Sequence, residues 1–191
     1  DIVASGSQKG YMIPPGLSFI AMSQKAWEAA EKSNLPKFYL NLKSYRKSLL
    51  TNSNPYTPAV NLVFALDEAL KMMREEGLDN IFQRHNKHKL AMSNAVKALN
   101  LKLFADEKYL SPSITAIKTE GIDAEEFRKT IKNNFDILLA GGQDHLKGKI
   151  FRVGHLGYVN DRDIITVVSA MSNTLLKLGK ISAQQAGEAL V

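Results

Sequence analysis

Two long amphipathic patterns that meet at one glycine constrain the fold of this chain most strongly. From Thr57, apolar side chains recur at helical spacing as far as Gly77, and a second stripe of this kind runs over 78–99. Glycine commonly ends a helix, because it adopts left-handed backbone conformations without strain. Two adjacent long helices joined at a glycine often mark the passage from one domain to the next. We therefore predict a helix from Thr57 that stops at Gly77, a helix over 78–99, and a domain boundary near residue 77.

The residues before these helices carry shorter patterns. Residues 1–4 read as the end of a buried strand, and residues 22–33 form a helical pattern with Ser23 as its cap. A short helix is predicted over 44–52. The segment 52–58 is rich in turn-forming residues and is predicted to be a loop.

The residues after Gly77 alternate strands with helices. Asp123, with Glu126 three residues later, resembles a capping box and opens a helix at 124–134. Asn160 is predicted to cap a helix that Gly179 ends, and a short helix covers 183–190. Short strands are predicted at 101–105, 114–119, 135–140 and 149–153. Residues 78–191 therefore read as an α+β domain, a small sheet with helices on one face.

Composition excludes several classes of function. The 191 residues carry a formal net charge of +6, but their basic residues are scattered among acids and are not interleaved with aromatic side chains. We therefore expect no nucleic-acid partner. No apolar stretch approaches the length of a membrane span, so we expect a chain without membrane contact. The chain has no cysteine, which excludes disulfides and cysteine-bound metal centres and fits a cytoplasmic location.

Lys9 is the first candidate for chemistry. It follows an apolar run that reads as a strand and precedes a Pro-Pro-Gly turn. A lysine that forms a Schiff base must be unprotonated part of the time, and desolvation favours the neutral amine. Most lysines, however, are ordinary solvated surface residues. The residues alone leave both interpretations of Lys9 open.

Arg152 is the second candidate, in the segment FRVGHLGYVND. A guanidinium binds a carboxylate through two parallel hydrogen bonds, a geometry that lysine cannot copy. The alternative is a surface salt bridge. Before Arg152, the Gly141-Gly142 pair indicates either a mobile flap or a hairpin connection.

Two histidines share one face of the helix predicted over 78–99. His85 and His88 are three residues apart, a spacing that metal sites use. No third ligand is evident, and both lie on an apolar stripe. We therefore interpret them as packed or hydrogen-bonded core histidines.

Four segments taken together resemble one family. They are SGSQKGYMIPPGLSF, NPYTPAVNLVFALDEAL, EEGLDNIFQRH and LAGGQDHLKGKIFRVGHLGYVND. In this order and spacing they resemble the class V aminotransferases of pyridoxal phosphate fold type I. The similarity is greatest to the alanine–glyoxylate and serine–glyoxylate or serine–pyruvate enzymes, a group in which some chains are labelled the small subunit of a soluble hydrogenase. The resemblance covers essentially the whole chain.

The resemblance implies roles for five residues. Lys9 matches the Schiff-base lysine, which also moves a proton to and from the substrate's α-carbon. Gln8 matches the residue that hydrogen-bonds the cofactor's phenolic oxygen. Thr57 matches a residue that reaches the cofactor phosphate of the partner subunit of a homodimer, and Asn54 occupies a position that often makes another such contact. Arg152 matches the arginine that binds the substrate carboxylate.

The resemblance also implies an arrangement of domains and an activity. Residues 1–77 match the last part of the large α/β cofactor-binding domain, and residues 78–191 match the small C-terminal α+β domain. The intact enzyme would be a homodimer that moves an amino group from alanine or serine to glyoxylate or pyruvate. In this family the aspartate and the aromatic residue that hold the cofactor ring precede the lysine. The chain therefore resembles the C-terminal half of such an enzyme, and we expect it to be inactive alone.

Other functions stay open at this stage. An accessory subunit of a soluble hydrogenase is one alternative, although a chain without cysteine would hold no nickel–iron or iron–sulfur centre of its own. A cysteine desulfurase needs a nucleophilic cysteine, which this chain lacks. The third alternative is a folded remnant with a binding or scaffolding role.

Overall fold

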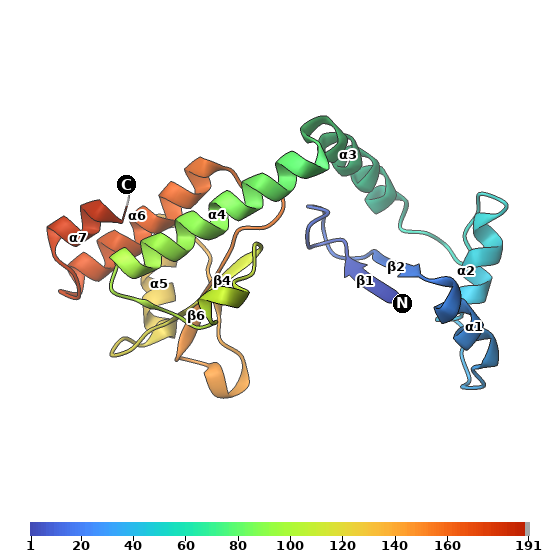
Figure 1. Ribbon diagram of the computed structural model, residues 1–191, viewed down its shortest axis with the longest axis horizontal. Helices are drawn as coiled ribbons and strands as arrows, with labels where there is room; N and C mark the ends of the chain where they lie inside the picture. The colour runs from blue at the N-terminus through green and yellow to red at the C-terminus, as the bar shows by residue number, and fades with distance from the viewer. Residues whose placement is uncertain (190–191) are drawn as a thin grey trace. The chain divides into compact units, whose positions relative to one another are not determined.

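The computed structural model describes residues 1–189 and divides into two compact units, Asp1–Glu75 and Glu76–Val191, which Figure 1 draws in ribbon form. Each unit is a mixture of helices and strands. Among the described residues, no helix combines the length and the apolar character needed to cross a membrane.

The first unit opens with a two-stranded antiparallel ribbon. Strand β1 (Ile2–Gly6) pairs along its whole length with β2 (Ser18–Met22). Helix α1 (Gln24–Lys32) follows, and the side chain of Ser23 accepts a hydrogen bond from the first turn, as the sequence predicted. The strand β2 was not predicted.

Strand β1 is exposed. Ile2 and Val3 keep 62% and 67% of their surface in solvent, so the prediction of a buried strand at 1–4 is wrong for this chain. The reason is that β1 and β2 pair only with each other among the described residues, and no third strand extends the ribbon. A ribbon of two strands cannot bury both of its faces.

Two further helices complete the first unit. Helix α2 (Leu42–Leu49) starts two residues before the predicted segment 44–52 and ends before it. Helix α3 (Val60–Glu76) stops before Gly77, as predicted, but starts three residues after Thr57. The difference has a steric cause, because a residue that precedes proline is disfavoured in the helical conformation and Pro58 follows Thr57.

The second unit is built on a four-stranded antiparallel sheet of order β3-β4-β6-β5. Its strands are β3 (Lys102–Leu103), β4 (Ile114–Lys118), β5 (Ala140–Gly141) and β6 (Ile150–Gly154). The strand predicted at 135–140 is wrong. The preceding helix continues to Phe135, and Asp136 then takes a left-handed conformation that ends it.

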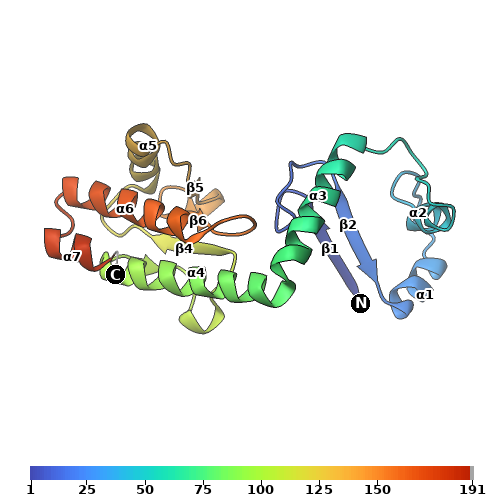
Figure 2. The same cartoon turned by 90° about the horizontal axis from the view of Figure 1, so that it is seen from above.

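The helices of this unit are α4 (Leu78–Ala98), α5 (Ala124–Phe135), α6 (Asp161–Lys177) and α7 (Ala183–Glu188), with short 3-10 helices at Glu107–Tyr109 and Asp144–Leu146. Asp123 caps α5, and Asn160 forms a full capping box with Asp163 at the start of α6. Figure 2 shows α4 and α6 running side by side. The predicted helix 183–190 ends in residue 190, which lies outside the described residues.

The hydrophobic core lies in the second unit. Helices α4, α5 and α6 contribute most of it, and residues of β4 and β6 add to it. Its largest fully buried apolar side chains are Phe127, Phe151, Met92, Leu99, Ile117, Ile131, Met171 and Leu175. The core covers one face of the sheet.

Candidate functional site

Lys9 lies in a tight turn directly after β1. Its amide donates a hydrogen bond to the carbonyl of Gly6 at 3.2 Å, and its own carbonyl accepts one from the amide of Met12 at 3.0 Å. The side chain is exposed and makes no hydrogen bond or ion pair with the described residues. The turn thus holds the backbone of Lys9 while its amine stays open to a ligand.

Ser7 holds the same turn from inside. It is completely buried, and its Oγ donates to the carbonyl oxygen of Pro14 at 2.7 Å and accepts from the amide of Leu17 at 3.1 Å. No sequence pattern indicated this role of Ser7. The run of small residues before Lys9 carries no signal that distinguishes Ser7 from its neighbours, because the contacts join residues up to ten positions apart.

The side chain of Gln8 lies close to Gly6, at the start of this turn. A Cβ atom on Gly6 would lie 2.7 Å from Oε1 of Gln8, closer than real Cβ contacts allow. The carboxamide of Gln8 folds back over the end of β1, and a side chain at residue 6 would require this flexible group to move. Gln8 and Lys9 are consecutive in one turn, as the sequence requires.

Asn54 and Thr57 lie in the exposed loop before α3. Neither side chain has a hydrogen-bond partner among the described residues, so both the amide and the hydroxyl are available. The loop is anchored between them by Tyr56, whose hydroxyl donates to the carbonyl of Phe38 at 2.9 Å and whose ring lies 4.8 Å from that of Tyr39. The aromatic contacts fix a loop that has little regular structure.

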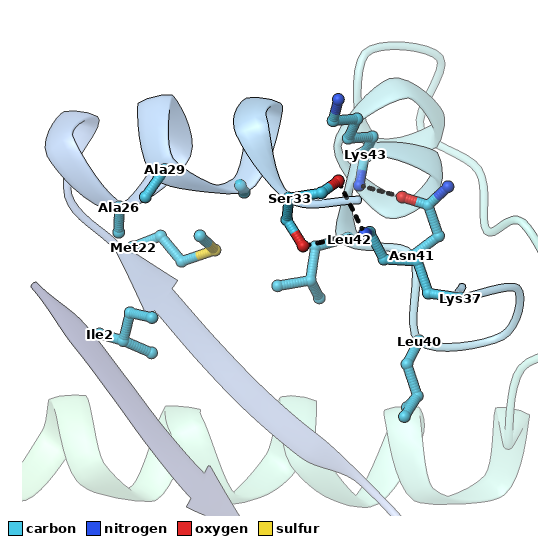
Figure 3. A pocket seen from close by; sticks show the side chains of 11 residues that line it. Ile2, Met22, Ala26, Ala29, Ser33, Lys37, Leu40, Asn41, Leu42 and Lys43 are labelled. Atoms are coloured by element: carbon cyan, nitrogen blue, oxygen red, sulfur yellow. Dashed lines mark hydrogen bonds between the residues drawn. The ribbon is translucent and has the colours of Figure 1, made fainter. Parts of the chain in front are cut away.

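The first unit also contains a cleft of about 340 Å³, shown in Figure 3. It lies between the ribbon, α1 and the segment that leads into α2, and its lining is mainly apolar. Its walls include Ile2, Met22, Ala26 and Leu42. None of the candidate site residues lines it, so the cleft is separate from the turn that carries Lys9.

Arg152 lies in the second unit, on β6, between two core residues. Phe151 and Val153 are buried, so their side chains face the core, and strand alternation puts Arg152 on the opposite face of the sheet. The residues beside it on the neighbouring strands are Ala116 and Ala140. Two small neighbours leave room for a long side chain to lie over the sheet.

The guanidinium of Arg152 is held at one atom only. Its Nε donates to the carbonyl of Gly141 at 2.9 Å, and it takes part in none of the ion pairs formed by the described residues. Arg152 therefore forms no surface salt bridge, the alternative that the sequence left open, with the described residues. A guanidinium fixed through Nε presents its two terminal nitrogens as a fork, the geometry that binds a carboxylate.

The Gly141-Gly142 pair forms a hairpin connection in this structure. Gly142 donates to the carbonyl of Ile150 at 3.1 Å and closes the β5–β6 pair. A Cβ atom on Gly142 would lie 2.1 Å from the carbonyl oxygen of Leu146, which no side chain tolerates. The close packing at Gly142 keeps Gly141 in place as the acceptor for Arg152.

Both histidines of α4 make hydrogen bonds, as predicted. The Nε2 of His85 accepts from the amide of Gly157 at 3.2 Å, and the Nε2 of His88 lies 3.0 Å from a carboxylate oxygen of Asp161. Within residues 1–189, no three His, Asp or Glu side chains are grouped as a metal site. A third histidine, His155, is fully buried, and this burial lowers its pKa to about 4.

Arg84, next to His85 on α4, also makes a hydrogen bond to Gly157. Its Nη1 donates to the carbonyls of Gly157 and Val159 at 2.9 and 2.8 Å, and its other nitrogens pair with both oxygens of Glu76. The hydrogen bonds from Arg84 lower the pKa of the Glu76 carboxyl. Helix α4 therefore holds the segment that follows Arg152 through hydrogen bonds to the amide and the carbonyl of Gly157.

The structure places the candidate residues in two groups. Gln8, Lys9, Asn54 and Thr57 belong to the first unit, and Arg152 belongs to the second. Each group has its own local support, and each offers polar groups without partners in the described chain. The first offers an amine, two amides and a hydroxyl, and the second offers a cationic fork.

Comparison with known proteins shows that the chain is similar to one family. The family model described as "Aminotransferase class-V" matches residues 1–164. A solved structure, ureidoglycine–glyoxylate aminotransferase from Bacillus subtilis, is similar with a TM-score of 0.89 and 29% identity, over 100% of this chain and 51% of that one.

Curated relatives are more similar in sequence. A "Soluble hydrogenase, small subunit" from Synechococcus is 58% identical over 94% of this chain and 47% of its own length. A serine–glyoxylate aminotransferase from Methylorubrum extorquens is 36% identical over 94% of this chain and 46% of its own. The chain spans about half the length of the curated relatives it matches.

Proposed function

This chain belongs to the class-V aminotransferases, and on that basis we propose that it supplies the lysine and the substrate arginine of a pyridoxal phosphate enzyme. The enzyme moves the amino group of alanine or serine to glyoxylate or pyruvate, and its location is cytoplasmic. The observation that carries the proposal is the turn of Lys9, which is locked at the backbone and open at the amine.

The donor groups of the first unit fit the cofactor. An amine suits its aldehyde, a carboxamide suits its phenolic oxygen, and a hydroxyl and an amide suit its phosphate. These groups are found at Lys9, Gln8, Thr57 and Asn54, and none of the four side chains has a partner among the described residues. When bound, pyridoxal phosphate supplies the electron sink for cleavage of a bond at the substrate's α-carbon.

The chain's own residues then have separate tasks. Lys9 holds the cofactor and carries a proton to and from the substrate's α-carbon, while Gln8 fixes the cofactor's orientation. Arg152 binds the substrate carboxylate through its free fork. Thr57 and Asn54 contact the phosphate in the partner subunit of a homodimer.

The relatives support glyoxylate as an acceptor. The names of the Bacillus subtilis and Methylorubrum extorquens enzymes both contain glyoxylate, although their amino donors differ. Every such substrate has a carboxylate. An arginine that recognises only this group agrees with a common acceptor and variable amino donors.

The proposal includes the domain division. Residues 1–77 complete the large cofactor-binding domain, and residues 78–191 form the small domain. In the resembled family the residues that hold the cofactor ring precede the lysine, so the 191 residues alone are expected to be inactive.

The test is turnover by a completed chain. The amino-terminal half of the Synechococcus relative is joined to this chain, and transamination is measured with alanine or serine and with glyoxylate or pyruvate. We expect turnover by the joined protein and none by the 191 residues alone. Appreciable turnover by the 191 residues would contradict the second expectation, and an inactive, folded joined protein would contradict the first.

An accessory role in a hydrogenase is the second candidate, and one observation favours it. The relative with 58% identity carries the name of a hydrogenase subunit. The chain has no cysteine for a metal centre, so it would depend on a partner that has one. Affinity capture of the tagged chain, followed by an assay of hydrogen-dependent dye reduction in the captured material, would reveal such a partner.

A further inference from the structure

Ser7 uses all of its polar groups inside the protein. Its side chain makes the two hydrogen bonds to Pro14 and Leu17, its amide donates to the carbonyl of Leu17 at 3.0 Å, and its carbonyl accepts from the amide of Ile13 at 3.3 Å. The residue has no exposed surface. A buried serine with every group paired is a fixed point for the chain around it.

These bonds close the loop that carries Lys9. Residues 7–17 leave the ribbon at the end of β1 and return at the start of β2, and Ser7 ties the outgoing end to the returning end. Lys9 is two residues from Ser7 and its hydrogen bonds. Any movement of Ser7 is therefore transmitted to the backbone of Lys9 through a single intervening residue.

The loop is not held by backbone preference. Met12, which donates to the carbonyl of Lys9, has a φ of 62°, a conformation that few residues other than glycine adopt. An unfavourable conformation persists only where surrounding contacts impose it. The side-chain bonds of Ser7 are among the contacts that do so here.

We propose that Ser7 is a positioning residue for Lys9: it fixes the turn so that the lysine amine meets its ligand at one defined point. The role of Lys9 itself rests on the proposed function. The hold of Ser7 on the turn does not, because it is a property of the chain without any ligand.

The first measurement needs no cofactor. Amide hydrogen exchange is followed by mass spectrometry in the 191-residue chain, for peptides covering residues 8–17 and, as a check on the fold, residues 60–75 in α3. In Ser7→Ala we expect exchange over residues 8–17 to accelerate about tenfold or more, with α3 unchanged. Equal exchange over 8–17 in wild type and Ser7→Ala would overturn the proposal.

Two variants guard this result. Ser18→Ala changes an exposed serine at the other end of the loop whose side chain makes no hydrogen bond with the described residues, and it should leave exchange as in wild type. Ser7→Cys keeps the side-chain volume with weaker hydrogen bonding. If Ser7→Ala also unfolds α3, Ser7→Cys decides, with partial acceleration over 8–17 supporting the hold and wild-type exchange overturning it.

The second measurement tests whether the contacts of Ser7 affect the reaction of Lys9 with pyridoxal phosphate. The joined protein is incubated with pyridoxal phosphate, reduced with borohydride and digested, and the label on Lys9 is compared with that on Lys32, an exposed lysine that forms no ion pair with the described residues. We expect Ser7→Ala to lower the Lys9-to-Lys32 ratio about threefold or more, and Ser18→Ala to leave it unchanged. An unchanged ratio despite a loosened turn would overturn the positioning role.

Failure of the proposed role of Lys9 and failure of the proposed role of Ser7 give different results. If wild type labels Lys9 no more than Lys32, the role of Lys9 in the proposed function is contradicted, and hydrogen exchange alone decides whether Ser7 holds the turn. If wild type favours Lys9 and Ser7→Ala does so equally, the proposed function stands and the role of Ser7 is overturned.

Discussion

The imidazole of His85 accepts a hydrogen bond at Nε2 from the amide of Gly157, while its Nδ1 lies 2.8 Å from the carbonyl oxygen of Ile81. A carbonyl only accepts, so Nδ1 carries the proton and Nε2 is the free acceptor. Gly157 has a φ of 79°, a left-handed conformation that favours glycine. The neutral ring of His85 therefore fixes the turn that joins β6 to α6.

Replacement of His85 tests this contact. His85→Phe keeps a planar ring but leaves the amide of Gly157 without an acceptor, so we expect the second unit to lose about 1–2 kcal/mol of unfolding free energy. Urea denaturation measures the loss. His145→Phe is the matched control, because His145 is exposed and its side chain makes no hydrogen bond in the described chain. Equal stability of the two variants would contradict the account.

His155 makes stability depend on pH. Burial holds its pKa at about 4 in the folded chain, below the value of about 6.5 in the unfolded chain. Between these values the unfolded chain binds more protons, so the free energy of unfolding falls as pH decreases from about 6.5 to about 4, by at most about 3 kcal/mol. Below pH 4 this contribution stays constant.

Urea unfolding at several pH values, in wild type and in His155→Gln, isolates this contribution. The difference in pH dependence between the two proteins should fall within that window, and His145→Gln should follow wild type. A wild-type slope that survives unchanged in His155→Gln would assign the dependence to other groups.

Gly142 should tolerate no side chain. In Gly142→Ala the new Cβ would meet the carbonyl oxygen of Leu146, so the β5–β6 hairpin must shift. We expect a loss of about 1–3 kcal/mol, measured by thermal or urea unfolding. Gly187→Ala in helix α7 is the control, because no atom of residues 1–189 lies within 4 Å of its added Cβ, and it should be neutral or slightly stabilising. A stable Gly142→Ala would refute the close packing.

Arg152 should not be replaceable by lysine. Arg152→Lys keeps the charge but loses the fork, so in the joined protein we expect kcat/KM for glyoxylate to fall by about 10- to 100-fold. Steady-state kinetics measure the change, and Arg162→Lys, at the exposed start of α6, serves as the control. Unchanged kinetics in Arg152→Lys would remove the arginine from substrate binding.

The helices could be predicted from the sequence because their signals are local. Ser23, Asp123 and Asn160 cap their helices as expected, and apolar stripes set the extent of α4 and α6. The predicted start of α3 at Thr57 is wrong, because Pro58 disfavours the helical conformation at Thr57. The strand predicted at 135–140 failed, because an apolar run does not reveal that Asp136 ends a helix inside it.

The resemblance proposes the site residues, but the contacts that support them are not predictable from the sequence. The contact of Ser7 with Leu17 spans ten residues, that of Arg152 with Gly141 spans eleven, and that of His85 with Gly157 spans 72. Such contacts depend on the register of strands and the packing of helices, which a local pattern does not contain. Tertiary structure therefore added the residues that hold Lys9 and Arg152 in place.

The central claim is that Lys9 holds the cofactor, and an absorbance titration tests it most directly. Pyridoxal phosphate is added to the joined protein and to its Lys9→Ala variant, and the visible band of a lysine-bound cofactor is recorded. The account predicts a band that saturates at about one cofactor per chain in wild type and is absent in Lys9→Ala. An equal, saturable band in both proteins would show that another residue binds the cofactor and would contradict the claim.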